Sequence, residues 1–284
     1  HFLAASNTHN AEQSKVSRQT PAIILAAHCI KQADTVYCAL LFWLFLMTDS
    51  VRLSKHLINL LGCSRREAQL YIEGGWVLVN GAIIDEPQFP ISNHVVELRA
   101  NAVAEPLPAI TLLLNQPLIP SVTLEQQLAL LKPESRWDED PSDILQLKGH
   151  FARLSSELPL QDNATGLQVF TQDWRTLRKL TDDRTRLEQE YVVQVSGEIS
   201  AQKLKRLAHA QMINGVGLPG CKASQQNEEH IRMVLKDPSE GVIERLCASI
   251  DLEVLAMKRI RIGAVSMGKL PLGQWRYCSP SQKF

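Results

Sequence analysis

The sequence predicts an α+β protein: a small helix-plus-hairpin domain followed by a larger domain on a mixed, largely antiparallel sheet. Three observations support this class. The stretch from Leu61 to Asp85 combines a capped helix with a two-residue hairpin turn. After residue 108, strand-like and helix-like segments follow one another without strict alternation, which favours an antiparallel sheet. Hydrophobic residues make up 45% of the 284 residues, enough for two modest domains with real cores.

The first domain is predicted from its helix signals. Ser64 and Glu67 have the spacing of a capping box, in which each side chain accepts a hydrogen bond from the backbone amide of the other, so a helix should begin at Arg65. Gly74 and Gly75 should end it, because glycine adopts positive φ at little cost. The segments that follow are a strand over Trp76–Val79, a type I′ turn at Asn80-Gly81 and a returning strand over Ala82–Ile84.

Basic residues gather around the start of this helix. Arg65 and Arg66 occupy its first turn, where free amides and the helix dipole favour anions, so two cations there call for a compensating partner. Arg52 and Lys55 precede them on another helical segment, which carries Leu53 and Leu57. Together these side chains form a suitable seat for phosphate groups. The alternative is a solvated basic corner with no ligand.

The motifs R-L-S-K, G-C-S-R-R-E-A and G-W-V-x-V-N-G, in this order over residues 51–99, resemble the S-four RNA-binding domain, named for its ribosomal-protein prototype. The resemblance implies binding of structured RNA by shape and backbone. The positions that it implies for RNA contact are Arg52, Lys55, Ser64, Arg65, Arg66 and Asn80.

Overall charge and cysteine usage bound the remaining functions. Thirty basic and thirty acidic residues give a net charge of zero, so RNA binding must depend on local basic patches. The six cysteines form no C-x-x-C pair, and no histidine pair has zinc-ligand spacing. We therefore expect free thiols in a reducing cytoplasm and no zinc site.

The first 46 residues differ from the rest of the chain. The apolar run at 36–46 is shorter than the roughly 20 residues of a membrane-spanning helix, and its position disfavours a signal peptide. A weak membrane anchor is the alternative to a natural start at Met47. We expect residues 1–46 to be a non-native or disordered leader, 47–100 the S-four-like domain, 101–108 a linker and 109–284 the second domain.

The second domain is predicted to mix strands and helices. The expected strands are Ala109–Leu114, Leu167–Thr171, Tyr191–Val195, His230–Leu235 and two further pieces between Val254 and Tyr277. The expected helices are Leu124–Leu131, Trp174–Leu180, Ala201–Gln211 and Glu240–Ile250, the last capped by Ser239. Trp76 and Trp174 are expected in the core, because each belongs to an apolar-patterned element.

Four motifs of this domain resemble the RsuA-type bacterial rRNA pseudouridine synthases. They are L-N-Q-P at 114–117, A-T-G-L-Q-V-F-T-Q-D at 164–173, E-Y-V-V at 190–193, and R-I-R-I-G at 259–263 with the later G-x-W-R. The resemblance implies the fold of that family and its reaction, the isomerisation of uridine to pseudouridine in structured rRNA without metal or cofactor. It also implies a flipped uridine, a catalytic Asp, an aromatic residue at Tyr191 that contacts the base, and an arginine that positions the Asp.

The chain departs from the family motifs at charged positions. The family Asp lies five residues before the glycine of the T-G-L motif, and this position is Gln161 here; with an insertion allowed, Ser155 takes its place. Asp162 could serve only after a local change in loop register, because neighbouring side chains on an extended chain point to opposite sides. Of the family arginine motif only Arg245 remains, and the lysine of L-N-K-P is Gln116.

Two hypotheses remain. In the first, the protein is an enzyme that isomerises uridine in rRNA, with Asp162, Tyr191 and Arg245 as its working residues. In the second, it keeps the fold and binds RNA or an assembly intermediate of the ribosome but is catalytically silent, because an amide at Gln161 can act neither as nucleophile nor as base. In either case we expect a monomer that binds no membrane.

Overall fold

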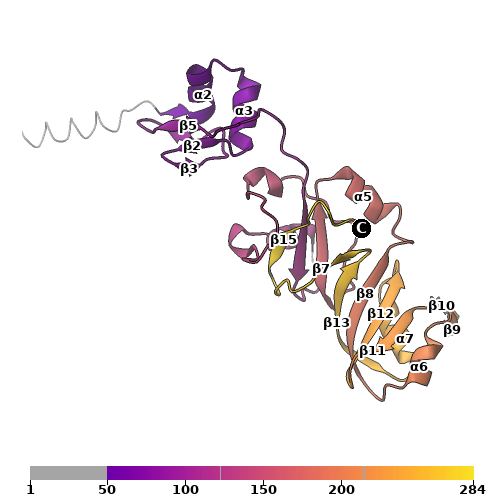
Figure 1. Ribbon diagram of the computed structural model, residues 1–284. Coiled ribbons are helices and arrows are strands. Elements are labelled where there is room, and N and C mark those ends of the chain that lie inside the picture. The colour runs from indigo at the N-terminus through magenta and orange to yellow at the C-terminus, as the bar shows by residue number, and fades with distance from the viewer. Residues whose placement is uncertain (1–49, 122, 214) are drawn as a thin grey trace, which may run out of the picture. The chain divides into compact units, whose positions relative to one another are not determined.

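The computed structural model describes residues 50–121, 123–213 and 215–284 (Figure 1). The described residues divide into two units, 50–51 with 90–92, and 52–89 with the described part of 93–284. The predicted leader, including the apolar run at 36–46, lies outside the described residues. Within the described part of the chain, no helix has the length and apolar character that a bilayer span needs.

The first described elements confirm the predicted helix and hairpin. Helix α3 begins at Arg65 behind a complete Ser64–Glu67 capping box. Asn80 and Gly81 both have positive φ, and they join two antiparallel strands, as the predicted I′ turn requires. The elements are β1 (Val51–Arg52), α2 (Leu53–Leu61), α3 (Arg65–Glu73), β2 (Val77–Val79), β3 (Ala82–Ile83), β4 (Pro90–Ile91) and β5 (Val96–Leu98), with β3, β2 and β5 in one sheet and β1 and β4 in another.

The following residues build an eight-stranded sheet. Its order is β11-β12-β8-β13-β7-β6-β15, and β14 pairs with β13. All neighbours are antiparallel except β13 and β7, so the predicted largely antiparallel sheet is confirmed. The strands are β6 (Thr111–Gln116), β7 (Ala164–Thr171), β8 (Glu188–Ser196), β11 (Lys222–Gln225), β12 (His230–Lys236), β13 (Glu253–Ile262), β14 (Val265–Ser266) and β15 (Trp275–Tyr277).

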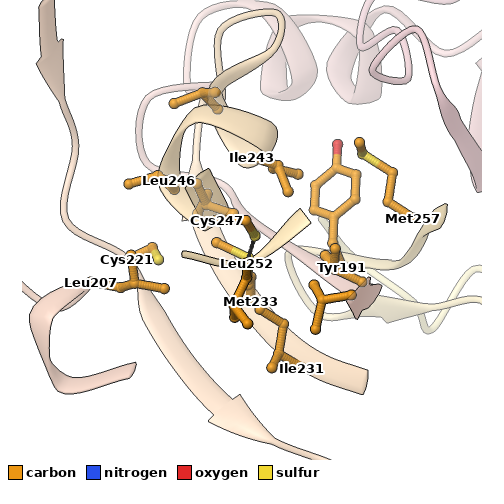
Figure 2. Packing of buried hydrophobic residues seen from close by; sticks show 14 of the residues in the cluster. Tyr191, Leu207, Cys221, Ile231, Met233, Ile243, Leu246, Cys247, Leu252 and Met257 are labelled. Carbon is orange, nitrogen blue, oxygen red and sulfur yellow. Dashed lines mark hydrogen bonds between the residues drawn. The ribbon is translucent and has the colours of Figure 1, made fainter. Parts of the chain in front are cut away.

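Short helices and a hairpin accompany this sheet. They are α4 (Leu124–Leu128), α5 (Trp174–Thr181), α6 (Ala201–Arg206), α7 (Val242–Ala248), the 3-10 turns η1 (Pro133–Ser135) and η2 (Lys148–Phe151), and the hairpin of β9 (Gln211–Ile213) and β10 (Val216–Leu218). The largest apolar cluster lies between α7 and strands β8, β12 and β13 (Figure 2). There Tyr191 packs beside Ile243 and Met257, while Met233 lies near Cys247.

Three details of the second domain were predicted wrongly. Helix α6 ends at Arg206 instead of Gln211, because Gln211 already belongs to β9. Ser239 does not cap α7 with its side chain; Gly241, at φ +67°, precedes the helix, and Ser239 supplies only a backbone carbonyl to Val242. Trp174 is 59% exposed, because it is the first residue of α5 and its ring lies beside the Arg175 guanidinium.

Candidate functional site

The first part of the candidate site is the N-terminus of α3. The Glu67 carboxylate accepts from the Ser64 amide at 2.8 Å, and the Ser64 hydroxyl accepts from the Glu67 amide at 3.2 Å. These bonds to Ser64 hold the pKa of Glu67 below its usual value. Glu67 therefore remains ionised and tied to the cap, and it does not neutralise the arginines of the same turn.

The cations of this surface are free to bind an anion. Arg52, Lys55, Arg65 and Arg66 are all exposed. Within residues 50–121, 123–213 and 215–284, none of the four forms an ion pair with a carboxylate. A cation that has no protein partner does not have to break an ion pair when it binds phosphate, so the phosphate-seat hypothesis keeps its physical basis.

Asn80 has a structural role in the turn between β2 and β3. Its side-chain oxygen accepts from the backbone amide of Val95 at 2.9 Å, and its own amide donates to the Val95 carbonyl at 2.8 Å. These bonds hold the turn against the loop before β5. Contact of Asn80 with RNA remains a prediction.

The second part of the candidate site is a cavity of about 240 Å³ beside the start of β7 and the end of β12. Its lining comes from two loops and two nearby side chains. The lining residues are Leu158, Pro159, Leu160, Gln161, Asp162, Arg184, Gln189, Asp237, Pro238, Ser239 and Glu240. Arg184 and Asp237 pair at 2.6 Å on this lining, so their charges offset each other.

Gln161, which stands at the family Asp position, is fixed by two hydrogen bonds. Its side-chain nitrogen donates to the Pro238 carbonyl at 3.1 Å, and its side-chain oxygen accepts from the Gly241 amide at 3.0 Å. The side chain is only 7% exposed. It ties the loop before β7 to the loop before α7, a role that a neutral amide fills with both of its ends.

Asp162 lines the same cavity but is exposed to solvent. Its carboxyl group hydrogen-bonds to that of Glu240, and this contact raises the pKa of Glu240 above its usual value. The two carboxyl groups therefore lie next to each other on the lining of the cavity.

Tyr191 and Arg245 are not among the residues that line the cavity with Asp162. Tyr191 is completely buried, its hydroxyl donates to the side-chain oxygen of Gln189 at 3.1 Å, and burial raises its pKa (Figure 2). Arg245 is exposed and donates to the backbone carbonyl of Glu240 at 2.9 Å. Their catalytic roles stay predictions.

Sequence reasoning missed Arg259 and Gln189. Arg259 on β13 is fully buried and donates five hydrogen bonds, all to neutral oxygen atoms. One of these acceptors is the side chain of Gln189, which lines the cavity. The R-I-R-I-G motif marked Arg259 as part of a family pattern, but no local signal indicated its partners, because they come from distant segments.

The fold and the site define an α+β protein with a basic helix-plus-hairpin module and a polar cavity on a mixed sheet. Residues 51–94 match the S4 domain family. The chain is 28% identical to the dual-specificity RNA pseudouridine synthase RluF of Escherichia coli, over 80% of this chain and 75% of that protein. It is 27% identical to the ribosomal small subunit pseudouridine synthase A of Pseudomonas aeruginosa, over 80% of this chain and 96% of that protein.

A crystal structure of a pseudouridylate synthase has the same fold, with a TM-score of 0.51, 18% identity, and coverage of 82% of this chain and 97% of that one. The chain is thus similar to RNA pseudouridine synthases over about four fifths of its length, and it contains a match to the S4 domain.

Proposed function

We propose that this protein binds structured ribosomal RNA through its S4 module and presents a uridine of that RNA to the cavity beside β7. The observation that carries the proposal is the exposed, unpaired set of cations at the start of α3, within a region that matches the S4 family. The names of the relatives support RNA, and ribosomal RNA in particular, as the partner. The family reaction is the isomerisation of uridine to pseudouridine.

If the chain catalyses this reaction, Asp162 is the carboxylate closest in sequence to the family position. It lines the cavity, and the carboxyl group of Glu240 lies beside it. The isomerisation breaks the bond from N1 of uracil to the ribose and forms one from C5. A proton must leave C5 and another must reach N1, so a carboxyl pair suits these transfers.

The second candidate function is RNA binding without turnover. The observation that favours it is Gln161, whose amide stands at the family Asp position and is engaged at both ends by Pro238 and Gly241. An amide neither attacks carbon nor accepts a proton at neutral pH. Under this alternative the protein acts on ribosomal RNA or on an assembly intermediate by binding alone.

Pseudouridine mapping distinguishes the two functions. Ribosomal RNA incubated with the protein is sequenced for pseudouridine, with Gln161→Ala, Asp162→Ala and Gln161→Asp in parallel. Modification that is lost in Asp162→Ala and kept in Gln161→Ala supports catalysis by Asp162. No modification by the natural protein, with bound RNA still detected, supports the silent alternative, and turnover gained by Gln161→Asp would strengthen it. Absence of any RNA binding contradicts both.

The oligomeric state, the cellular location, the absence of metal and cofactor, and the domain boundaries expected from the sequence are proposals as well. We propose a monomer that works in the cytoplasm, where ribosomal RNA is found, without metal or cofactor. We also propose domain boundaries at 47–100 and 109–284, with 101–108 as a linker. Mass determination of the native N-terminus tests the proposed leader at 1–46, and sedimentation in solution tests the monomer.

A further inference from the structure

The orientation of the Gln189 amide is fixed by its neighbours. Gln189 lies on β8, two residues before Tyr191 and therefore on the same face of the strand. Its side-chain oxygen accepts from Nη1 of Arg259 at 2.9 Å and from the Tyr191 hydroxyl at 3.1 Å. A guanidinium group can only donate, so the amide atom that faces Arg259 must be the oxygen. The amide nitrogen consequently points to the other side.

That nitrogen has no acceptor among the residues that the structure describes. The Gln189 residue is only 2% exposed, yet it is one of the residues that line the cavity beside β7. The nitrogen is not one of the fully enclosed side-chain atoms without a partner among the described residues, so it is open to the cavity, where a ligand or water can accept its hydrogen bond. The cavity therefore contains a donor group that is directed at a guest.

Arg259 makes this donor stronger than an ordinary amide. The guanidinium is fully buried, and its acceptors are the carbonyls of Leu158, Pro159 and Leu167 and the side chains of Gln168 and Gln189, none of them a carboxylate. Its positive charge is thus not offset by any group that it contacts. A cation that bonds to the oxygen of an amide polarises the amide and strengthens the bond that its nitrogen can donate.

We propose that the side-chain nitrogen of Gln189 donates a hydrogen bond to a carbonyl oxygen of a uracil base held in this cavity. Uracil offers a carbonyl oxygen that can accept from Gln189 and, beside it, an N–H group that can donate to the carboxyl oxygens of Asp162 or Glu240 on the same lining. Gln189 is then a specificity-determining residue for the base. The inference rests on the proposed function, which makes uridine the ligand.

The test uses uridine 5′-monophosphate as the probe and the full chain labelled with nitrogen-15. The side-chain NH₂ resonances of Gln189 are assigned by their absence in Gln189→Glu. That variant keeps the acceptor for Arg259 and Tyr191 and replaces only the free nitrogen, so the fold should survive. We expect the Gln189 resonances of the natural protein to shift with millimolar nucleotide but not with ribose 5-phosphate, and Gln189→Glu to bind about tenfold more weakly, as the loss of one buried hydrogen bond implies.

Gln168→Glu is the matched control. Gln168 is also buried and also accepts from Arg259 at 3.0 Å, but its nitrogen donates to Ser156 and to the Leu158 carbonyl and does not face the cavity. Nucleotide affinity should be retained in this variant. Unshifted Gln189 resonances, or equal binding by Gln189→Glu, would overturn the proposal. The proposed RNA-binding function is tested by a separate experiment, which measures the affinity for ribosomal RNA with and without Arg65 and Arg66. Its failure can therefore be distinguished from failure of the Gln189 proposal.

Discussion

Two glutamines, Gln161 and Gln189, place uncharged amides at the cavity beside β7. Gln161 is hydrogen-bonded at both ends of its amide, to Pro238 and to Gly241, whereas the structure shows a hydrogen bond only at the oxygen of Gln189. The spacing from Gly166 directed attention to position 161, and Gln161 lines this cavity. The free nitrogen of Gln189 could not be predicted, because its orientation depends on Arg259, which is 70 residues away in the sequence. Contacts between side chains on different strands, such as that of Gln189 with Arg259, can be identified only once the pairing of the strands is known.

The buried His150 predicts a pH dependence of the protein's stability. It is 3% exposed, and its Nδ1 lies 2.8 Å from the Tyr277 hydroxyl. Burial, together with the nearby Arg136, lowers its pKa from the usual 6.5. A histidine with a lowered folded pKa binds protons more readily in the unfolded chain. Its contribution to stability is therefore complete above about pH 6.5 and is lost as the pH falls toward the folded pKa.

The measurement is the free energy of unfolding in urea as a function of pH, for the natural protein and His150→Gln. We expect the natural protein to lose up to about 1.4 kcal/mol per pH unit more than the variant below pH 6.5. The variant keeps a polar partner for Tyr277 and differs from the natural protein only at position 150, so the difference isolates His150. Parallel curves for the two proteins would refute the prediction.

Local signals decided which helices were predicted correctly. The helices α3 and α5 begin where the sequence placed them, because Ser64 and Asp173 accept hydrogen bonds from the backbone of the first turn. The helix α7 lacks such a signal: Gly241 turns the chain by a positive φ, and no side chain caps the helix. The amphipathic pattern predicted α6 to extend beyond its observed end at Arg206. The helix ends earlier because the following residues pair as β9 with β10, and sequence periodicity does not indicate that contact.

The capping box of α3 predicts how the stability of this helix depends on the Ser64 side chain. Ser64→Ala removes the acceptor for the Glu67 amide and should destabilise the helix by about 1 kcal/mol, the usual cost of a lost N-cap. Amide hydrogen exchange in α3 measures this change. Ser64→Thr keeps the hydroxyl and should exchange at nearly the natural rate. If exchange in α3 is as slow in the alanine variant as in the natural protein, the cap does not stabilise this helix.

At the scale of the molecule, the sequence determined the class of the fold but not the order of its strands. Mixed strand and helix patterns predicted an α+β protein, and the sheet is antiparallel at every pairing but one. The parallel contact of β13 with β7 joins residues 257–259 to 164–166. Pairings over such separations leave no periodic trace in the chain, since each strand has the same alternation whichever neighbour it takes.

The chain has 30 basic and 30 acidic residues, and this balance predicts how the RNA affinity of the whole protein depends on salt. Because no global field attracts RNA, the salt dependence should reflect the local cations Arg52, Lys55, Arg65 and Arg66, with a slope of log affinity against log salt between about −2.8 and −3.6. Arg65→Ala with Arg66→Ala should roughly halve this slope and weaken binding to ribosomal RNA. The control, Lys205→Ala with Lys269→Ala, removes the same charge from exposed positions in the second domain and should leave the slope nearly unchanged. Equal slopes for the two double variants would mean that the start of α3 is not where phosphate binds.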